Sequence, residues 1–496
     1  MTTTHRLTIA TAIVIAISAT DVTAQTASPQ SLIARAARAM GGEQALDSLR
    51  NKTIDFNTSA FAIGQEETPD GPPRATLSYG RQVMDYAGPR RLTAQEARLV
   101  NGTINRQRRI ILPTMSMLEN NGALTMDPAT VPAGLDRLNS LQLERIMLAA
   151  MHHGGSATLL RPRSLRGQMA DGVRLPLGPD TVNVWFDRTS GLPMATETIA
   201  DDGIFGDRRT LTLYSRWQDA GGLELPRQID VEVNGRLQNH TVLTSVAVNQ
   251  ALPDSLFAIP DSMRAKAPPM PATPNTPAAP PPIVAPLLSI APGVWRAEGA
   301  NHYSLVVEQG TTGLLVIEAP LSAQRSAAVL DTLRKRFPGR AVTGVVLTHH
   351  HHDHSGGIRA YMARGIRVFA HERNRGFLQE VARAPKSVSP DRLTRGAPVP
   401  MITSVRDSLA VGTGAGRVVL YPLPSTHAQG ILAAWVPSAG VVFTSDVLSP
   451  QANQPLPKAG SAEMVAFAQS VGIAPTRFVG GHGVPAEWSA VETAAR

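Results

Sequence analysis

Histidine is concentrated in one short segment of this chain of 496 residues. Five of the 13 histidines lie within residues 349–354, directly after an apolar, β-branched stretch. His349 and His351 are two positions apart, so in an extended segment both side chains project to the same side and can bind one metal ion. Asp353 and His354 follow, where the chain turns at a Ser-Gly-Gly sequence, and can contact a second ion nearby. The spacing favours two metal ions over one.

The surroundings of this segment distinguish it from a tag-like or metal-scavenging histidine run. Such runs occur in low-complexity sequence, whereas this one lies between a predicted strand and a glycine turn. The chain has no cysteine, which excludes disulfides, thiolate nucleophiles and every cysteine-containing metal site. Any metal centre must therefore use histidine and carboxylate ligands.

The segment resembles the His-X-His-X-Asp-His signature of the metallo-β-lactamase fold, an αββα sandwich with its metal site at one edge. Three further matches follow in the family's order: His427 in a Pro-Ser-Thr-His-Ala-Gln-Gly loop, Asp446 at a strand end and His482 after another strand. The resemblance covers about residues 288–496. It implies a dinuclear zinc hydrolase in which a metal-bridging hydroxide attacks the carbonyl of an ester, lactone, thioester or β-lactam; the signal-like residues 1–24 add that it is exported.

The resemblance also implies a role for each matched residue. Asp446 is expected to bridge two Zn²⁺ ions, and Asp353 to act as the catalytic residue that orients the water and relays its proton. The sequence identifies no substrate-binding residue. The predicted ligands are His349, His351 and His427 for the first zinc ion, and Asp353, His354 and His482 for the second.

Several residues bear on which branch of the family the chain resembles. Flavodiiron members have Glu at the second ligand position, so His351 favours zinc hydrolysis over iron redox chemistry. Asp446 makes the site more similar to lactonases and thioesterases than to lactamases with all-histidine sites. Glu318 stands where the family commonly has Asp. A mono-iron sulfur dioxygenase-like oxidoreductase remains an alternative.

The remaining sequence predicts how the chain is divided. Residues 287–496 alternate strands and helices and are predicted to be an α/β domain of the metallo-β-lactamase fold. Residues 265–286 are rich in proline and are predicted to be a linker. Residues 25–264 are predicted to be a mostly antiparallel β domain, because period-two stretches occur at 181–187, 209–214 and 228–234, with helices at 30–40 and 135–151.

The N-terminal region resembles the half-barrel of periplasmic lipoprotein-carrier proteins. This resemblance leaves a second alternative function open, in which the protein binds or carries an apolar ligand and the metal domain is secondary. Nothing in the sequence indicates the oligomeric state.

Composition and targeting signals narrow the partners and the location. The net charge is +8, but the longest basic run is residues 334–336, so nucleic-acid binding is not expected. We expect a small-molecule substrate instead. Residues 1–24 have the short basic, apolar and small-residue regions of a signal peptide, with an apolar run too short to span a bilayer. We therefore expect a periplasmic or secreted protein without an integral membrane segment after signal cleavage.

Overall fold

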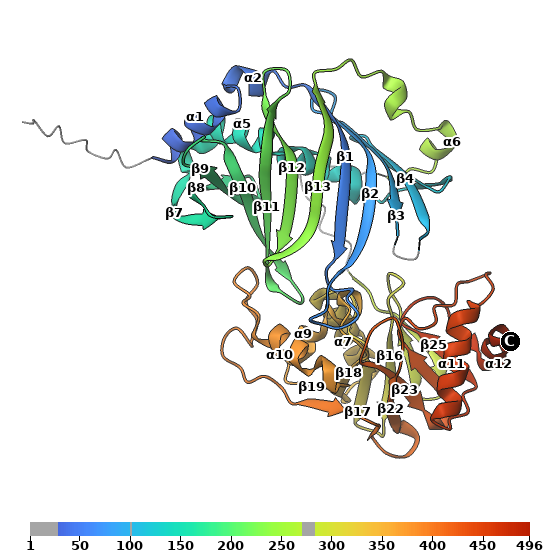
Figure 1. Cartoon of the computed structure of the whole chain (residues 1–496). Helices are drawn as coiled ribbons and strands as arrows, with labels where there is room; N and C mark the ends of the chain where they lie inside the picture. Colours follow the sequence, from blue (N-terminus) through green and yellow to red (C-terminus); the bar gives the residue numbers. More distant parts are fainter. Residues whose placement is uncertain (1–27, 100–101, 270–282) are drawn as a thin grey trace, which may run out of the picture.

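The structure is a computed structural model that describes residues 28–99, 102–269 and 283–496 (Figure 1). Its N-terminal part is one antiparallel sheet with the strand order β6-β5-β4-β3-β2-β1-β13-β12-β11-β10-β9-β8-β7. The strands are β1 (Asn51–Ala62), β2 (Arg74–Asp85), β3 (Arg90–Arg98), β4 (Ile104–Ile111), β5 (Ser116–Asn120), β6 (Ala123–Met126), β7 (Thr158–Leu165), β8 (Gln168–Leu177), β9 (Asp180–Asp187), β10 (Pro193–Asp202), β11 (Gly206–Asp219), β12 (Glu224–Val233) and β13 (Arg236–Val248).

Helices cover one face of this sheet. Helix α1 (Pro29–Ala39) begins where Ser28 accepts a hydrogen bond from the Ser31 amide, with Pro29 in the first turn. Its apolar side packs with α2 (Glu43–Asp47) and α5 (Leu143–His153) against strands β8 and β9. Burying this face stabilises a sheet whose other residues remain partly exposed. The prediction of a mostly antiparallel domain is confirmed.

One predicted helix is interrupted. The pattern over residues 135–151 indicates a single helix, but the structure has α4 (Leu135–Ser140) and α5 separated at residues 141–142, after the short α3 (Thr130–Ala133). Gln142 has extended backbone angles, so the chain changes direction there. Leu141 and Gln142 both line a cavity of the N-terminal domain, which the apolar periodicity alone could not indicate.

The C-terminal part contains two sheets. The first has the order β14-β15-β16-β17-β18-β19-β20 and the second β21-β22-β23-β24-β25-β26. The first comprises β14 (Leu287–Ala291), β15 (Val294–Ala297), β16 (Ser304–Gln309), β17 (Gly313–Ile317), β18 (Ala341–Leu347), β19 (Arg367–His371) and β20 (Ile402–Val405). The second comprises β21 (Leu409–Val411), β22 (Val418–Leu423), β23 (Ile431–Val436), β24 (Val441–Thr444), β25 (Arg477–Gly480) and β26 (Ala486–Glu487).

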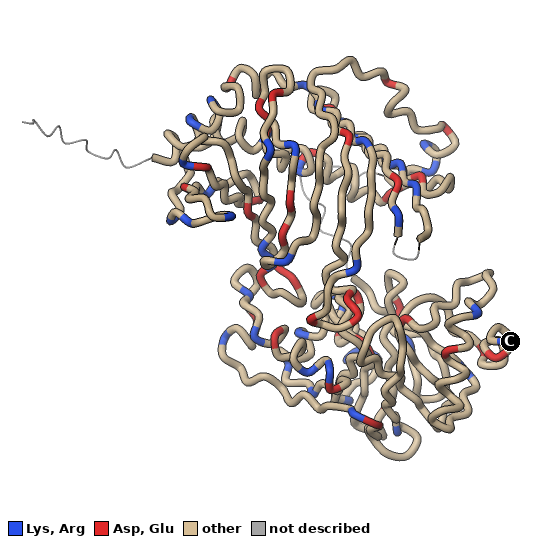
Figure 2. Tube along the Cα trace, in the orientation of Figure 1, with Lys and Arg blue, Asp and Glu red and all other residues tan. Residues whose placement is uncertain are grey.

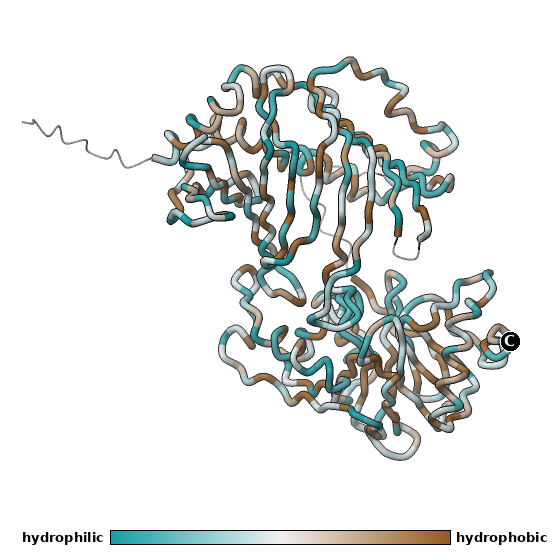
Figure 3. The backbone as a smooth tube through the Cα atoms, viewed as in Figure 1, coloured by the Kyte–Doolittle hydropathy of each residue, from teal (hydrophilic) through white to brown (hydrophobic). Residues whose placement is uncertain are grey.

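These two sheets pack face to face, with helices outside each. One core cluster joins residues of both sheets, including Leu315, Val346 and Phe443. The apolar strands are brown in Figure 3, as expected of strands buried on both faces. The outer helices are α7 (Ala323–Arg336), α9 (Ile358–Met362) and α10 (Arg375–Arg383) on the first sheet, and α11 (Lys458–Ser470) and α12 (Trp488–Ala495) on the second. This αββα arrangement confirms the predicted fold.

Other predictions fall partly outside the described residues. The predicted signal peptide lies outside them, as does most of the proline-rich segment, although α6 (Asp261–Arg264) precedes it. Within the described ranges, every helix is too short or too polar to cross a bilayer. Basic and acidic residues are interspersed over both parts of the molecule (Figure 2), in keeping with the absence of a long basic run.

Candidate metal centre

The seven predicted ligands converge at one edge of the C-terminal sandwich, on loops that follow its strands. Residues 349–354 follow β18 and enter the short helix α8 (His352–Ser355). His427 lies between β22 and β23, Asp446 follows β24, and His482 follows β25. Loop ends of neighbouring strands meet at one sheet edge, so residues more than 130 positions apart can share a site. The structure brings all seven together.

The first group of possible ligands has free nitrogen atoms facing one point. One ligand atom from each member lies within 4.8 Å of the others in the group His349, His351, His427 and Asp446. Nε2 of His349, Nδ1 of His351 and Nε2 of His427 are buried and make no hydrogen bond. Buried polar atoms are normally paired, so three unpaired imidazole nitrogens beside a carboxylate fit a metal ion.

The second group lies next to the first. Its members are His302, Asp353, His354 and His482, again with ligand atoms within 4.8 Å of one another. Nε2 of His354 lies 3.1 Å from Nε2 of His482 and 3.2 Å from Oδ2 of Asp353. Two nitrogens and a carboxylate oxygen thus face a common position, as expected for a second cation.

Asp446 lies between the two groups. Its Oδ2 is 3.0 Å from Nε2 of His427, in the first group. Its Oδ1 is 2.9 Å from Nε2 of His354 and 3.2 Å from Nε2 of His482, in the second. Each carboxylate oxygen therefore faces a different group, which is the geometry a bridging ligand needs.

His302 is the member that the sequence did not indicate. It lies in the turn between β15 and β16, where Ala300 and Asn301 have positive φ angles of 50° and 55°. Its Nδ1 contacts the Ala300 carbonyl at 2.9 Å, which leaves Nε2 directed at Asp353 Oδ2, 3.4 Å away. A single histidine without neighbouring ligand types gives no motif, so only the fold brings it to the site.

Hydrogen bonds from outside the two groups fix which nitrogen each histidine presents. Glu318 Oε2 accepts from Nδ1 of His354 at 2.6 Å. The other carboxylate oxygen of Glu318 accepts from the Thr348 hydroxyl. That hydroxyl lies 3.1 Å from Nδ1 of His349. The Asn301 carbonyl accepts from Nδ1 of His482 at 2.6 Å. In each imidazole the remaining Nε2 is then free to bind a metal ion.

Glu318 occupies a strained position at the end of β17. Its φ angle is +78°, in the left-handed region that residues other than glycine rarely adopt, and its side chain is fully buried. The Glu318 carboxylate, longer than the Asp common in the family that the sequence resembles, contacts His354 directly and His349 through Thr348.

Burial also sets the protonation of the first group. Burial and the neighbouring His427 imidazole lower the pKa of His351 to about 3, and burial lowers the pKa of His349 well below its ordinary value. These imidazoles are therefore neutral at neutral pH, the form that binds metals.

The carboxylates of the centre remain ionised. Burial opposes ionisation of Asp446, but the neighbouring imidazoles of His354 and His427 outweigh it and lower the pKa of this carboxyl. Burial likewise opposes the charged form of His354, yet Glu318 and Asp353 raise its pKa well above the ordinary value. The surroundings of His354 thus favour positive charge at this position, which a divalent cation also supplies.

The other two histidines of the window do not join either group. His350 is buried and its Nε2 donates to the Glu66 carbonyl at 3.0 Å, whereas His352 stacks on Phe377. Both point away from the two groups. Glu66 belongs to the N-terminal part of the chain. The sequence did not indicate Glu66 or its neighbour Gln65 as site residues, because neither belongs to a recognisable motif.

A protein-family model matches the part of the chain that contains this centre. The sequence model of the "Metallo-beta-lactamase superfamily" matches residues 297–486, which include all seven predicted ligands. This segment is a metallo-β-lactamase superfamily domain. The N-terminal sheet lies outside the match.

Individual relatives are distant and only partly covered. A hydroxyacylglutathione hydrolase of Cereibacter sphaeroides is 29% identical over 149 residues, which are 30% of this chain and 48% of that protein. An (R)-specific secondary-alkylsulfatase of Pseudomonas sp. is 28% identical over 93 residues, or 18% of this chain and 14% of that protein. The chain thus matches less than half the length of these hydrolases.

Solved structures also match the C-terminal part. A metallo-beta-lactamase from Pontibacter korlensis has a TM-score of 0.34 and 16% identity, covering 42% of this chain and 95% of that one. A metallo beta lactamase from Hirschia baltica has a TM-score of 0.33 and 15% identity, covering 43% of this chain and 96% of that one.

Proposed function

We propose that the protein is a dinuclear zinc hydrolase that acts on the carbonyl of an ester, lactone, thioester or β-lactam. The observation that carries this proposal is the position of Asp446, whose two oxygens face two separate groups of ligand atoms. Neutral imidazoles and carboxylates, with no thiolate, suit Zn²⁺. The distant hydrolases of the same superfamily support the reaction class and leave the substrate open.

The chain's own residues would hold two ions in fixed positions. When bound, such ions lower the pKa of a shared water and polarise a substrate carbonyl. His349, His351 and His427 would hold the first, and Asp353, His354 and His482, with His302 beside them, the second. Hydrogen bonds that the rings donate to Glu318 and Thr348 keep the histidines in the orientations that this requires.

Asp353 is placed to handle a proton. Its Oδ1 accepts a hydrogen bond of 2.7 Å from the Gln65 amide, whereas Oδ2 faces the second group. Hydrogen bonds from His302 and His354 outweigh the effect of burial and lower the pKa of this carboxyl. Asp353 is therefore ionised and can orient a water and accept its proton through Oδ2.

The test is hydrolysis by the full chain and by a matched pair of variants. Chromogenic cephalosporin, acyl lactone, ester and thioester substrates would be assayed with wild type, Asp353→Asn and the exposed-site control Asp407→Asn. We expect at least one substrate to be hydrolysed, with a loss of about 100-fold or more in Asp353→Asn and none in the control. Equal activity in both variants would contradict the assignment of Asp353.

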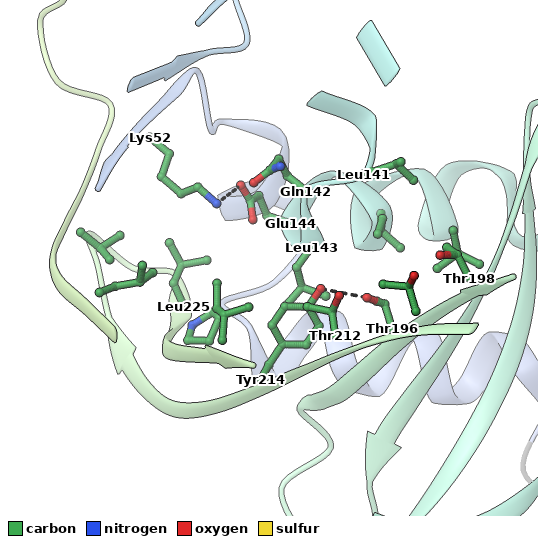
Figure 4. A pocket seen from close by; sticks show the side chains of 17 residues that line it. Lys52, Leu141, Gln142, Leu143, Glu144, Thr196, Thr198, Thr212, Tyr214 and Leu225 are labelled. Carbon is green, nitrogen blue, oxygen red and sulfur yellow. Dashed lines mark hydrogen bonds and ion pairs between the residues drawn. The ribbon is translucent and has the colours of Figure 1, made fainter. Parts of the chain in front are cut away.

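A cavity in the N-terminal sheet favours a second candidate role, the binding of an apolar ligand. Its volume is about 310 Å³, and it lies between α5 and the strands around β11 (Figure 4). Leucine, isoleucine and valine side chains form much of its wall. Glu144 lies at one end, 2.5 Å from Lys52, and Thr196 bonds to Tyr214 at 2.9 Å. An apolar wall with a few polar groups is typical of ligand pockets.

This role can be tested separately from hydrolysis. Thr212 lines the cavity, so Thr212→Trp should fill it, whereas Leu159→Trp adds the same side chain at an exposed position. A fluorescent fatty-acid probe should bind wild type and Leu159→Trp and bind Thr212→Trp at least ten-fold more weakly. Tight binding by a chain that hydrolyses no substrate would favour the carrier role, and no binding would exclude it for such probes.

We also propose export to the periplasm or the outside of the cell. The support is the pattern of residues 1–24, with a basic start, an apolar stretch and small residues at the end. Cell fractionation with N-terminal sequencing should find the chain outside the cytoplasm and beginning near Gln25. An uncleaved cytoplasmic chain would contradict export.

A further inference from the structure

The connection between β1 and β2 leaves the N-terminal sheet and contacts the loops that carry the ligands (Figure 1). The Gly64 carbonyl accepts from the His352 amide at 3.1 Å, within the histidine window. Arg74 at the start of β2 donates to the His427 carbonyl at 2.6 Å. The Glu67 carbonyl accepts from the Gln429 amide at 2.7 Å. This connection, residues 63–73, and the adjoining Arg74 therefore bind the backbone of two ligand loops, the histidine window and the loop that carries His427.

The carbonyl of Glu66 fixes the orientation of a ligand ring. It accepts a hydrogen bond of 2.8 Å from Nε2 of His351. The proton then resides on Nε2, which leaves Nδ1 as the unprotonated nitrogen, and Nδ1 is the atom that is buried without a partner. His351 thus presents the opposite nitrogen from His349, and its Nε2 is bonded to the N-terminal domain.

The side chain of Glu66 holds this carbonyl in place. Only 1% of Glu66 is exposed. Its carboxylate accepts from the Gly64 amide at 2.8 Å and pairs with Arg236 at the start of β13. A charge buried to this extent requires its partner, so loss of Arg236 would release the turn from the sheet.

Gln65 contacts the second group. Its Nε2 donates to Oδ1 of Asp353 at 2.7 Å, across 288 positions of sequence. Because Oδ1 is occupied by this bond, Oδ2 is the oxygen that faces His354 and His482. Two consecutive residues of the N-terminal domain therefore contact one ligand in each group.

From these contacts we infer that the N-terminal domain is an integral part of the metal centre, with Gln65 and Glu66 as positioning residues for Asp353 and His351. The inference rests on the proposed function, because it concerns the same centre. Partners that orient metal ligands typically change metal affinity by about 10- to 100-fold when they are removed. The domain thus contributes to metal binding whatever its cavity holds.

The test measures metal binding by the full chain. Zn²⁺ affinity would be measured by competition with a chelating dye, and ligand geometry from the visible spectrum of the Co²⁺-loaded protein. Gln65→Ala and Arg236→Ala should each weaken binding by about 10- to 100-fold and change the Co²⁺ spectrum. Arg236→Lys retains the charge and should recover part of the affinity. The control is Arg81→Ala, which removes an ion pair with Asp55 on strands β1 and β2, away from the metal centre.

The outcomes separate this inference from the proposed function. If Gln65→Ala and Arg236→Ala, both folded by circular dichroism, bind metal and absorb like wild type, the inference is wrong although the metal centre stands. Gln65→Ala removes only one amide, so it keeps the test valid if Arg236→Ala does not fold. His351→Ala should lose binding as a positive control. A wild-type chain that binds no metal would overturn the proposed function and with it the inference.

Discussion

Glu318 accepts a hydrogen bond of 2.6 Å from Nδ1 of His354, and both side chains are completely buried. The carboxylate fixes the ring so that its Nε2 faces Asp446 and His482. A second oxygen of Glu318 reaches His349 through the Thr348 hydroxyl. One buried residue thus orients a histidine in each group, which makes it a sensitive point for substitution.

Glu318→Ala should lower Zn²⁺ affinity by about 10- to 100-fold, because His354 loses its acceptor and the Thr348 hydroxyl that contacts His349 loses its own. Chelator competition would measure the change. Glu380→Gln, at an exposed position of α10, should bind metal like wild type. Unchanged affinity in Glu318→Ala would mean that packing alone holds the rings.

Asp446→Asn should reduce the metal content from about two ions per chain to about one. An amide presents one oxygen and one nitrogen donor, so it cannot bridge two cations as a carboxylate does. Elemental analysis after dialysis would show the loss, and hydrolysis should fall at least about 100-fold. Retention of both ions would show that Asp446 is not a bridge.

His302→Ala should weaken metal binding at the second group only. Nε2 of His302 lies 3.4 Å from Oδ2 of Asp353, whereas the first group lies on the other side of Asp446. We expect about a ten-fold loss for the weaker of two binding events and no change in the other. A titration that is unchanged in both steps would remove His302 from the centre.

Asp391→Asn should destabilise the protein in a manner that depends on pH. Burial alone would raise the pKa of Asp391, but hydrogen bonds from the buried Arg359 and from Thr394 lower it from 3.8 to about 2. A carboxyl with a lowered folded-state pKa adds stability above its unfolded pKa, and that stability is lost as pH falls through the folded value. The contribution is about 2 kcal/mol at pH 7.

Urea unfolding of wild type and Asp391→Asn at pH 7, 5, 4 and 3 would check this sign. The difference in unfolding free energy should be constant from pH 7 to 5 and about halved at pH 3. Asp331→Asn removes an exposed pair with Arg334 and should show little difference at any pH. If the difference in unfolding free energy between wild type and Asp391→Asn increased on acidification, the lowered pKa of Asp391 would be contradicted.

The candidate metal ligands could be singled out from sequence because they lie in short segments next to strands with clear patterns. The histidine window follows β18 directly, and its spacing indicated two ions, whereas His427, Asp446 and His482 were added because the chain resembles a known family. The α/β alternation could be predicted because the strands are continuous apolar runs, and the family resemblance added the αββα arrangement.

The contacts between domains could not be predicted in this way. Gln65 and Asp353 are 288 positions apart, and Glu66 acts through its backbone carbonyl, which every residue has. His302 is a single histidine that a turn with two left-handed residues places at the centre. Such residues become recognisable only when the fold has brought them to the ligands.

The metal content of the full chain, produced without a histidine tag and measured by elemental analysis, tests the central claim most directly. Two groups of ligand atoms joined by Asp446 predict about two zinc ions per chain, with hydrolysis that disappears on chelation and returns with zinc. A single iron ion per chain would instead support the alternative of a mono-iron sulfur dioxygenase-like oxidoreductase. No bound metal would contradict the dinuclear centre.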